Sequence, residues 1–395
     1  MNLPKASEQL AYFRKQQSNV LDIIQQIVEI ESPSDVKAAV DRLNTVLASR
    51  FGELGGKVQV HRQGKFGNHL EINFAGANRT AKPVLLLGHT DTVYPIGTIS
   101  KMKYRIAKGR VFGPGVLDMK AGIALALHVI EALLAWHKGR LPRPLTVLLV
   151  SDEEIGSHSS RALTESLAGK SEAVLVLEPA SGLNGAVKTA RKGVGGYTLQ
   201  VTGKAAHSGL DFEKGQSAVL ELARQILEIS NLTDLSKGIT LNVGRISGGT
   251  RVNVVPAEAT ASLDVRVAAE KDAEEIHRRL MSLKPFNAHC KITVSGELNR
   301  PPMQRSAGVA ALYDKARSIA SDLGWGLEEA SVGGGSDGNF TAALGIPTLD
   351  GLGPEGGDGA SRRENILLAS IPRRAAMLAG VIARLPGLLE SGSSK

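Results

Sequence analysis

Cysteine is almost absent from this sequence, because Cys290 is the only one among 395 residues. A single cysteine excludes an intramolecular disulfide and any cysteine-rich metal site. Its place in the run HCKITVSG, where apolar and polar residues alternate, predicts a structural position in a strand.

Long hydrophobic runs are missing as well. The first residues, MNLPKASEQLAYFRKQQ, lack the apolar core of a secretory signal, and no run of about 18 apolar residues occurs further along. We therefore expect a cytoplasmic protein without a membrane partner.

Charge is not concentrated anywhere in the chain. Lys and Arg number 47 against 39 Asp and Glu, which gives a net charge of +8, but the basic residues form no long run. A nucleic-acid-binding face would show clustered Lys and Arg, so we expect no nucleic-acid partner. A mildly positive surface is still compatible with anionic small substrates.

The hydrophobic content of 42% is ordinary for a globular protein, and its patterning predicts an α/β fold. Residues 7–30 space apolar side chains at helical intervals, which predicts one amphipathic helix. Four short apolar runs predict buried strands, with a helix at 119–137 between the first two. These runs are 83–89, 145–154, 173–180 and 346–353.

A different texture occupies residues 193–303. Its predicted order, strand-helix-strand-strand-helix-strand, is that of a split βαβ (ferredoxin-like) unit. The α/β pattern resumes afterwards with a helix at 308–324. We therefore predict an inserted domain at 193–303 and a main domain formed by 1–192 and 304–395.

Polar side chains follow three of the predicted strands, at the point where each strand ends. They are His89 with Asp91, then Asp152, Glu153 and Glu154, then Glu178, and Asp118 precedes the helix at 119–137. Because the carboxyl ends of strands form the ligand crevice of open α/β sheets, we expect these groups to converge. One histidine with several carboxylates suits zinc, manganese or cobalt, and the excess of carboxylates indicates two metals that share a ligand.

Two further roles are predicted from spacing. Asp91 lies two residues after His89 and is placed to orient the imidazole. Glu153 adjoins the candidate ligand Glu154 and is free to act as general base on a water molecule. Taken singly, these residues have structural explanations, such as a hydrogen-bonded pair or a helix N-cap at Asp118. Their joint occurrence at strand ends favours a site.

The motifs that contain these residues resemble those of the dinuclear zinc carboxypeptidase and deacylase family, over nearly the whole chain. Within it they are most similar to bacterial glutamate carboxypeptidases. The resemblance implies a mixed-sheet catalytic domain, an inserted dimerisation domain and a homodimer. The motifs are GHTDTVYPIGT, GPGVLDMKAG, SDEEIGSHSSR, LEPA, GKAAHSG, NVVPAEATASLDVR and GGGSDGNFTAALGIPTLDGLG.

The resemblance also implies roles for single residues. One zinc ion would be held by His89, Asp118 and Glu178, and Asp118 would bridge to a second, which Glu154 also holds. Glu153 would be the base, Asp91 the orienter, and His207 the group that stabilises the tetrahedral oxyanion in the partner subunit. Asn253, Arg266 and Arg300 would surround the substrate carboxylate. For Arg266 and Arg300, a strand salt bridge and a surface arginine remain alternatives.

A competing motif lies at residues 334–338, GGSDG, which fits the G-x-S-x-G elbow of serine hydrolases. That elbow needs a histidine downstream, and the last histidine of this chain is His289. We therefore expect a glycine turn instead, in which the N–H groups around Gly335 bind a substrate carboxylate.

One ligand of the family is missing. The loop at 349–366, LDGLGPEGGDGASRRENI, resembles one that carries a histidine four residues before a glutamate, and that histidine completes the second metal's shell. Here Glu364 is present, but Ala360 stands at the histidine position, and a helix start is expected after the basic pair. Ala360 is either a natural loss or an inactivating substitution, unless Asp358 or His158 substitutes.

Three functions follow from these patterns. The first is metal-dependent hydrolysis of an amide bond that releases a C-terminal acidic residue, glutamate above all, from a small peptide or N-acyl substrate. It requires two zinc ions, which cobalt or manganese can replace. The second is N-acyl amino acid deacylation or desuccinylation. The third is a metal-impaired, inactive binding protein.

Overall fold

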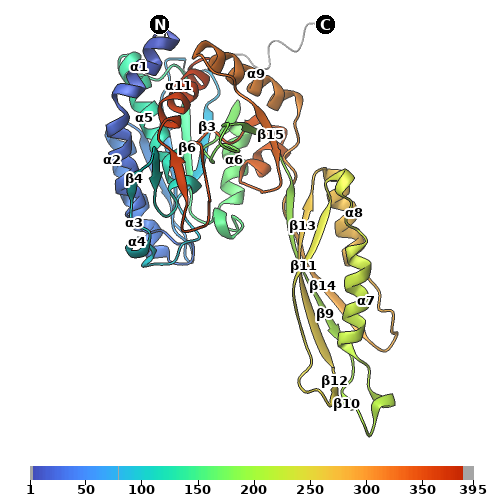
Figure 1. The fold of residues 1–395 in the computed structure, drawn as a ribbon. Helices are drawn as coiled ribbons and strands as arrows, with labels where there is room; N and C mark the ends of the chain where they lie inside the picture. The colour runs from blue at the N-terminus through green and yellow to red at the C-terminus, as the bar shows by residue number, and fades with distance from the viewer. Residues whose placement is uncertain (1–2, 79, 386–395) are drawn as a thin grey trace, which may run out of the picture. The chain divides into compact units, whose positions relative to one another are not determined.

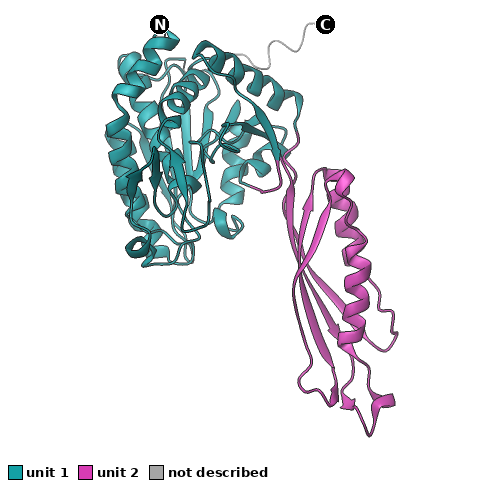
Figure 2. Ribbon diagram, viewed as in Figure 1, with its two compact units in different colours: residues 1–190, 305–331, 336–395 teal, residues 191–304, 332–335 magenta. Residues whose placement is uncertain are grey.

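The computed structural model describes residues 3–78 and 80–385, and the chain divides into two compact units (Figure 2). Unit 1 comprises residues 1–190, 305–331 and 336–395, and unit 2 comprises 191–304 and 332–335. The segment 332–335 lies far along the chain from the rest of unit 2, and the backbone N–H of Lys192 donates to the Val332 carbonyl there. Local sequence patterns cannot predict that residues 332–335 belong to unit 2, because the contact joins distant parts of the chain.

A six-stranded mixed sheet forms the centre of unit 1, in the order β1-β2-β6-β3-β7-β16. Strands β6, β3, β7 and β16 are parallel to one another, and β1-β2 and β2-β6 are antiparallel pairs. Every residue of β3, β6 and β7 is buried, as expected for parallel strands covered on both faces. The strands are β1 (Lys57–His61), β2 (His69–Phe74), β3 (Val84–His89), β6 (Leu145–Val150), β7 (Ala173–Val176) and β16 (Thr348–Leu349).

Helices cover both faces of this sheet (Figure 1). Side chains alternate along the strands, so that Leu86 joins one apolar cluster while Leu85 and Leu87 join another. The larger cluster includes α1, α2, α3, α5, α9 and α11, and the smaller one includes α6. These helices are α1 (Ala6–Lys15), α2 (Gln17–Val28), α3 (Lys37–Glu53), α5 (Ala121–Trp136), α6 (Arg161–Lys170), α9 (Ala307–Asp322) and α11 (Ser370–Ala383); α4 (Thr98–Lys101) and α10 (Gly338–Ala343) are short.

The N-terminal segment forms two helices, so the prediction of one helix over 7–30 was wrong. Gln16 separates α1 from α2 with φ −92° and ψ 8°, outside the helical region. Phe13 and Val20, on either side of it, are both buried in the same core. The spacing of apolar residues shows that both segments share one buried face. It does not show that the helix is interrupted at a single residue.

The segment Val116–Trp136 is long and apolar enough to cross a membrane, but 78% of its most apolar window is buried inside the protein. It begins with an irregular turn at Val116–Lys120 and continues as α5, which packs on α11 and α2. It is therefore the core helix of unit 1.

A second, small antiparallel sheet was not predicted. Its order is β17-β18-β5-β4, and it joins residues near position 110 to the glycine-rich loop. The helix start expected after the basic pair was wrong, because β18 comes first and α11 begins only at Ser370. Strand β18 forms because it pairs with β5, which is distant in the sequence, and its residue Ile366 is fully buried. Its strands are β4 (Arg105–Ala107), β5 (Arg110–Phe112), β17 (Gly356–Gly357) and β18 (Asn365–Leu367).

Unit 2 is an antiparallel sheet in the order β11-β13-β9-β14, with α7 and α8 on one face (Figure 1). Chain order and sheet order together are those of a ferredoxin-like fold. Cys290 is buried, but it lies directly before β14 rather than inside it. The elements are β9 (Gly193–Thr202), β10 (Ala206–His207), α7 (Ala218–Ser230), β11 (Thr240–Gly248), β12 (Val254–Val255), β13 (Glu258–Val267), α8 (Glu270–Met281) and β14 (Lys291–Arg300).

Candidate metal centre and active site

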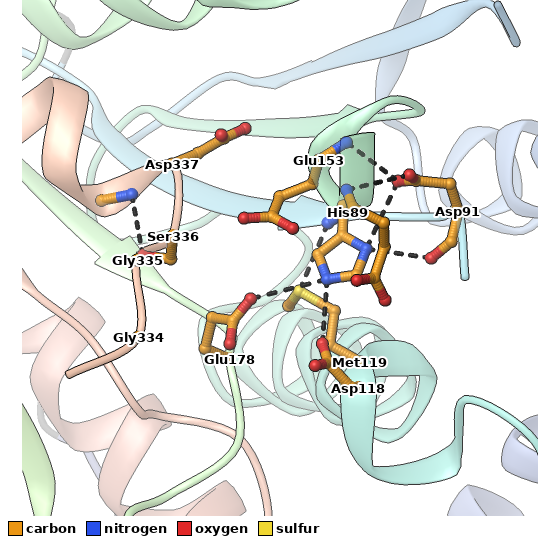
Figure 3. Close-up of polar contacts among 12 residues, drawn as sticks. His89, Asp91, Asp118, Met119, Glu153, Glu178, Gly334, Gly335, Ser336 and Asp337 are labelled. Atoms are coloured by element: carbon orange, nitrogen blue, oxygen red, sulfur yellow. Dashed lines mark hydrogen bonds and ion pairs between the residues drawn. The ribbon is translucent and has the colours of Figure 1, made fainter. Parts of the chain in front are cut away.

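The strand-end residues converge at one edge of the main sheet (Figure 3). His89 ends β3 and lies opposite Val150, the last residue of the adjacent strand β6. Glu178 follows β7, on the other side of β3. Because the three strands are parallel and in register, their polar ends meet in space as the sequence predicted.

His89 is the centre of this cluster. Its Nε2 atom lies 3.0 Å from Oδ1 of Asp118 and 3.5 Å from Oε1 of Glu178. Ligand atoms of His89, Asp118 and Glu154 all lie within 4.8 Å of one another. Asp118 reaches the cluster from the turn before α5, and its peptide bond to Met119 is cis.

Asp91 lies on the far side of the imidazole. The Nδ1 atom of His89 is 3.0 Å from the backbone carbonyl of Asp91 and 3.4 Å from its carboxylate. The Asp91 carboxylate accepts hydrogen bonds from the N–H groups of Glu153 (3.2 Å) and Glu154 (3.1 Å), and from Oγ of Ser34 (2.7 Å). Asp91 therefore contacts the imidazole through both its main-chain carbonyl and its carboxylate, and the carboxylate also links the acidic segment after β6 to β3.

Electrostatics in the cluster favour a cation. Burial acts to lower the pKa of His89, but Asp118, Asp91 and Glu178 together raise it well above its ordinary value. The pKa of Glu154 is raised to about 9, mainly by burial; His89 acts against the rise, and the carboxylates of Asp118, Glu153 and Asp91 contribute to it. Several carboxylates around one histidine carry more negative charge than the histidine offsets, and a divalent ion removes that imbalance.

The donor set fits one borderline cation well. His89, Asp118 and Glu178 offer nitrogen and oxygen atoms without thiolate, the set that suits zinc, manganese or cobalt. Glu154 adds a further carboxylate, with a ligand atom within 4.8 Å of those of His89 and Asp118.

The loop around Ala360 contributes no ligand to this group. Ala360 is exposed, with a left-handed backbone at φ 55°. Asp358 is exposed and lies 3.5 Å from Arg363, and His158 is exposed on the segment after β6. Within residues 3–78 and 80–385, the group of candidate ligands includes neither of them.

The sequence did not predict several residues that lie near the candidate metal centre. Lys188 is buried, with Nζ 3.8 Å from the Glu178 carboxylate. Tyr94 and Glu364 form a hydrogen-bonded pair beside the Asp118 turn. Only Glu364 had a signal in the sequence, its spacing after Ala360, and that signal did not indicate its partners.

His207 and Asn253 are neighbours in unit 2, and both are exposed. His207 pairs with Val254 across β10 and β12, and the Asn253 carbonyl accepts the N–H of Ser208 (3.0 Å). The N–H groups of Gly209 and Leu210 donate to Nδ1 of His207 at 3.1 and 3.2 Å. In the neutral ring the proton then lies on Nε2, the atom available as a donor.

Arg266, Arg300 and Gly335 form a second group in unit 2. Arg266 donates to both carboxylate oxygens of Asp264 at 2.8 Å, which is the strand salt bridge that the sequence left open. Arg300 is buried at the end of β14, and not on the surface. A Cβ at Gly335 would lie 3.0 Å from Cδ of Arg300, so glycine permits the close approach.

Hydrogen bonds from Arg191 also hold the glycine turn at 333–335 in place. Arg191 donates to the carbonyls of Gly334 and Gly335 at 3.0 and 3.2 Å. Ser336, the serine of the elbow motif, is fully buried and donates to Asp350 at 2.6 Å. Its hydroxyl is thus a structural donor, which argues against the serine hydrolase alternative.

Sequence comparisons show the family. The family model described as Peptidase family M20/M25/M40 matches residues 85–384. Carboxypeptidase G2 of Pseudomonas sp. (strain RS-16) is 31% identical over 94% of this chain and 90% of its own. Succinyl-diaminopimelate desuccinylase of Pseudomonas syringae pv. syringae (strain B728a) is 29% identical over 82% of this chain and 87% of its own.

Solved structures share the fold. The aminopeptidase PepT from Bacillus cereus ATCC 10987 has a TM-score of 0.78 at 22% identity, covering 93% of this chain and 98% of that one. An M20 family metallo-carboxypeptidase from Sulfolobus solfataricus has a TM-score of 0.71 at 18% identity, covering 92% and 98%. The family match, the related sequences and the metal-ligand cluster converge, and the chain is a hydrolase that belongs to Peptidase family M20/M25/M40.

Proposed function

We propose that this protein is a zinc-dependent carboxypeptidase that hydrolyses an amide bond and releases a C-terminal acidic residue, glutamate above all, from a small peptide or N-acyl substrate. The observation that carries the proposal is the convergence of His89, Asp118, Glu154 and Glu178 at the strand ends. Similarity to carboxypeptidase G2 over 94% of the chain supports it.

The residues of this chain divide the chemistry among them. A bound zinc ion supplies Lewis acidity, which polarises the amide carbonyl and makes a nearby water more acidic. Glu153 adjoins the ligand Glu154, so we assign it to take the proton of the attacking water and return it to the leaving amine. Asp91 keeps the His89 ring in place, and Nε2 of His207 donates to the oxyanion.

Specificity for an acidic residue rests on unit 2. Asn253, Arg266 and Arg300 are assigned to the substrate carboxylates. A planar guanidinium group pairs with a carboxylate at two points, and Arg266 would exchange its partner Asp264 for the substrate. Gly335 lies in the glycine turn at 333–335, and the N–H groups around it are assigned to bind a substrate carboxylate. We also propose that unit 2 dimerises the protein, so that His207 serves the partner subunit. A cytoplasmic location fits the buried, free Cys290.

The test is Glu153→Ala in the zinc-loaded protein, with hydrolysis of N-acyl glutamates and metal content measured together. We expect a loss of about 10²- to 10⁴-fold in kcat with unchanged zinc content. Glu165→Ala, which removes a partly exposed acid on α6, is the matched control. Unchanged turnover in Glu153→Ala with the metal still bound would falsify the assignment.

The second candidate is an N-acyl amino acid deacylase or desuccinylase. It is supported by the 29% identity to a succinyl-diaminopimelate desuccinylase. A kinetic screen of N-acyl and N-succinyl amino acids separates the two, because a strong preference for an acidic C-terminal residue is expected only of the carboxypeptidase.

The third candidate, an inactive binding protein, is supported by Ala360. With only Asp118 and Glu154 left for it, the second zinc is expected to bind weakly. Ala360→His adds the missing donor at an exposed position, where it disturbs no packing, and Ala360→Ser is the control. We expect zinc per subunit to rise from about one toward about two, together with turnover. No rise in either would show that the gap is already compensated.

A further inference from the structure

Glu364 is a fully buried carboxylate beside the metal centre. Its Oε1 atom accepts the backbone N–H groups of Leu117 (2.7 Å) and Asp118 (3.1 Å). Its Oε2 atom accepts the N–H of Gly115 (3.3 Å) and the hydroxyl of Tyr94. Both oxygens are thus occupied by donors, three of which belong to the turn that carries Asp118.

The small sheet brings Glu364 to this turn. Glu364 directly precedes β18, in which Asn365 pairs with Phe112 of β5. Arg110 of β5 adds a hydrogen bond to Oδ1 of Asn365 (2.5 Å). Because β5 leads into the Asp118 turn, the ladder sets the register between the turn and the carboxylate.

Hydrogen bonds to an ionised acceptor are about twice as strong as those between neutral groups. A buried backbone N–H that loses its partner leaves the cost of its desolvation without compensation. The three N–H groups at residues 115–118 therefore hold the main chain of the turn against Glu364. The side chain of Asp118 is then left facing His89, 3.0 Å away.

We propose that Glu364 is a positioning residue for the metal ligands: its carboxylate fixes the main chain at Asp118 and thereby sets the direction of the shared ligand. The inference rests on the proposed function only in that Asp118 binds a metal. It assigns to Glu364 a task that does not depend on a histidine at position 360.

Glu355 provides a matched control in the same loop. It is also fully buried, but its carboxylate pairs with Arg373 and, in the part of the chain that the structure describes, does not bond to residues 115–118. Glu355→Gln therefore removes a buried charge at a comparable cost in stability, without touching the Asp118 turn.

The experiment compares Glu364→Ala, Glu364→Gln and Tyr94→Phe with wild type and Glu355→Gln. Co²⁺ affinity is measured by competition with a chelator, the coordination of bound Co²⁺ by its visible absorption spectrum, and Tm by circular dichroism. We expect Glu364→Ala to weaken Co²⁺ binding by about 10- to 100-fold and to change the spectrum. Glu364→Gln keeps an acceptor oxygen and should restore part of the affinity, and Tyr94→Phe should have the smallest effect.

Glu355→Gln should lower Tm and leave Co²⁺ affinity and the spectrum unchanged. The proposal is overturned if Glu364→Ala and Glu364→Gln lower Tm as Glu355→Gln does, but bind Co²⁺ with wild-type affinity and spectrum. If Glu364→Ala does not fold, the same comparison is decided by Glu364→Gln and Tyr94→Phe. Wild type that binds no Co²⁺ also overturns it. Wild type that binds Co²⁺ as expected but hydrolyses no amide contradicts the proposed function alone.

Discussion

The candidate site residues of unit 1 and unit 2 differ in how far the protein itself satisfies them. In unit 1, His89, Asp91 and Glu178 are buried and in contact with one another or with their neighbours. In unit 2, Arg300 is buried and Arg266 pairs with Asp264, but His207 and Asn253 are exposed. The unit 1 residues are therefore already held by contacts within the protein, whereas the side chains of His207 and Asn253 face solvent. Substitutions in the two units should therefore have different signatures.

Among the substitutions that compare the two units, removal of His207 should give the largest effect and the clearest separation of kcat from metal binding. His207→Ala deletes the proposed oxyanion donor, so we expect a loss of about 10²- to 10³-fold in kcat. Zinc content and Tm should stay at wild-type values, because the side chain is exposed. Steady-state kinetics and metal analysis of the same preparation check this. A loss of zinc in the variant would contradict the comparison.

Removal of the Asp91 charge should act through the metal instead. The N–H groups of Glu153 and Glu154 each donate to one carboxylate oxygen of Asp91. In Asp91→Asn one of these oxygens becomes an amide NH₂ group, so one of the two N–H groups loses its acceptor. We expect zinc affinity to fall by about 10- to 100-fold and Tm to fall with it. Zinc competition and thermal unfolding are the measurements. Unchanged affinity alongside reduced kcat would mean that Asp91 acts on the reaction directly.

A buried acid in unit 2 should stabilise the fold through its charge. Burial acts to raise the pKa of Glu221, but hydrogen bonds from Gln225 and from the N–H groups of Asn287 and Phe286 lower it below 4.5 overall. A depressed pKa contributes stability above pH 4.5, which is lost as the pH falls through the folded value. Glu221→Gln should therefore cost about 1–3 kcal/mol at pH 7 and less at pH 3, by urea unfolding. An equal cost at both values would contradict the charge argument.

An effect of the opposite sign is expected at Glu154. In metal-free protein its pKa is raised to about 9, mainly by burial, so the folded state binds more protons than the unfolded chain between pH 4.5 and pH 9. Stability should fall as the pH rises through that window. Glu154→Gln should raise Tm at pH 7 in chelator-treated protein, and it should weaken zinc binding. A lower Tm in the metal-free variant would contradict the argument.

The sequence predicted the metal-ligand candidates that directly follow strands. His89 and the acids after β6 and β7 follow apolar runs, and parallel pairing in register then brings them together. The break at Gln16 and the strand at Asn365–Leu367 were missed, because a single residue's backbone and a pairing of distant segments leave no periodic trace. Glu364 was noticed for its spacing, while its bonds to residues 115–118 required the fold.

Ala360 keeps a left-handed backbone that costs a non-glycine residue about 1–2 kcal/mol and that histidine tolerates better. The conformation survives without the side chain because β17 and β18 anchor the loop on both sides. Under the proposed ligand assignment, the residues that hold this loop and the residue that would add a ligand are different ones. A single exchange at position 360 would then change the ligands of a second metal without any change in the strands that anchor the loop.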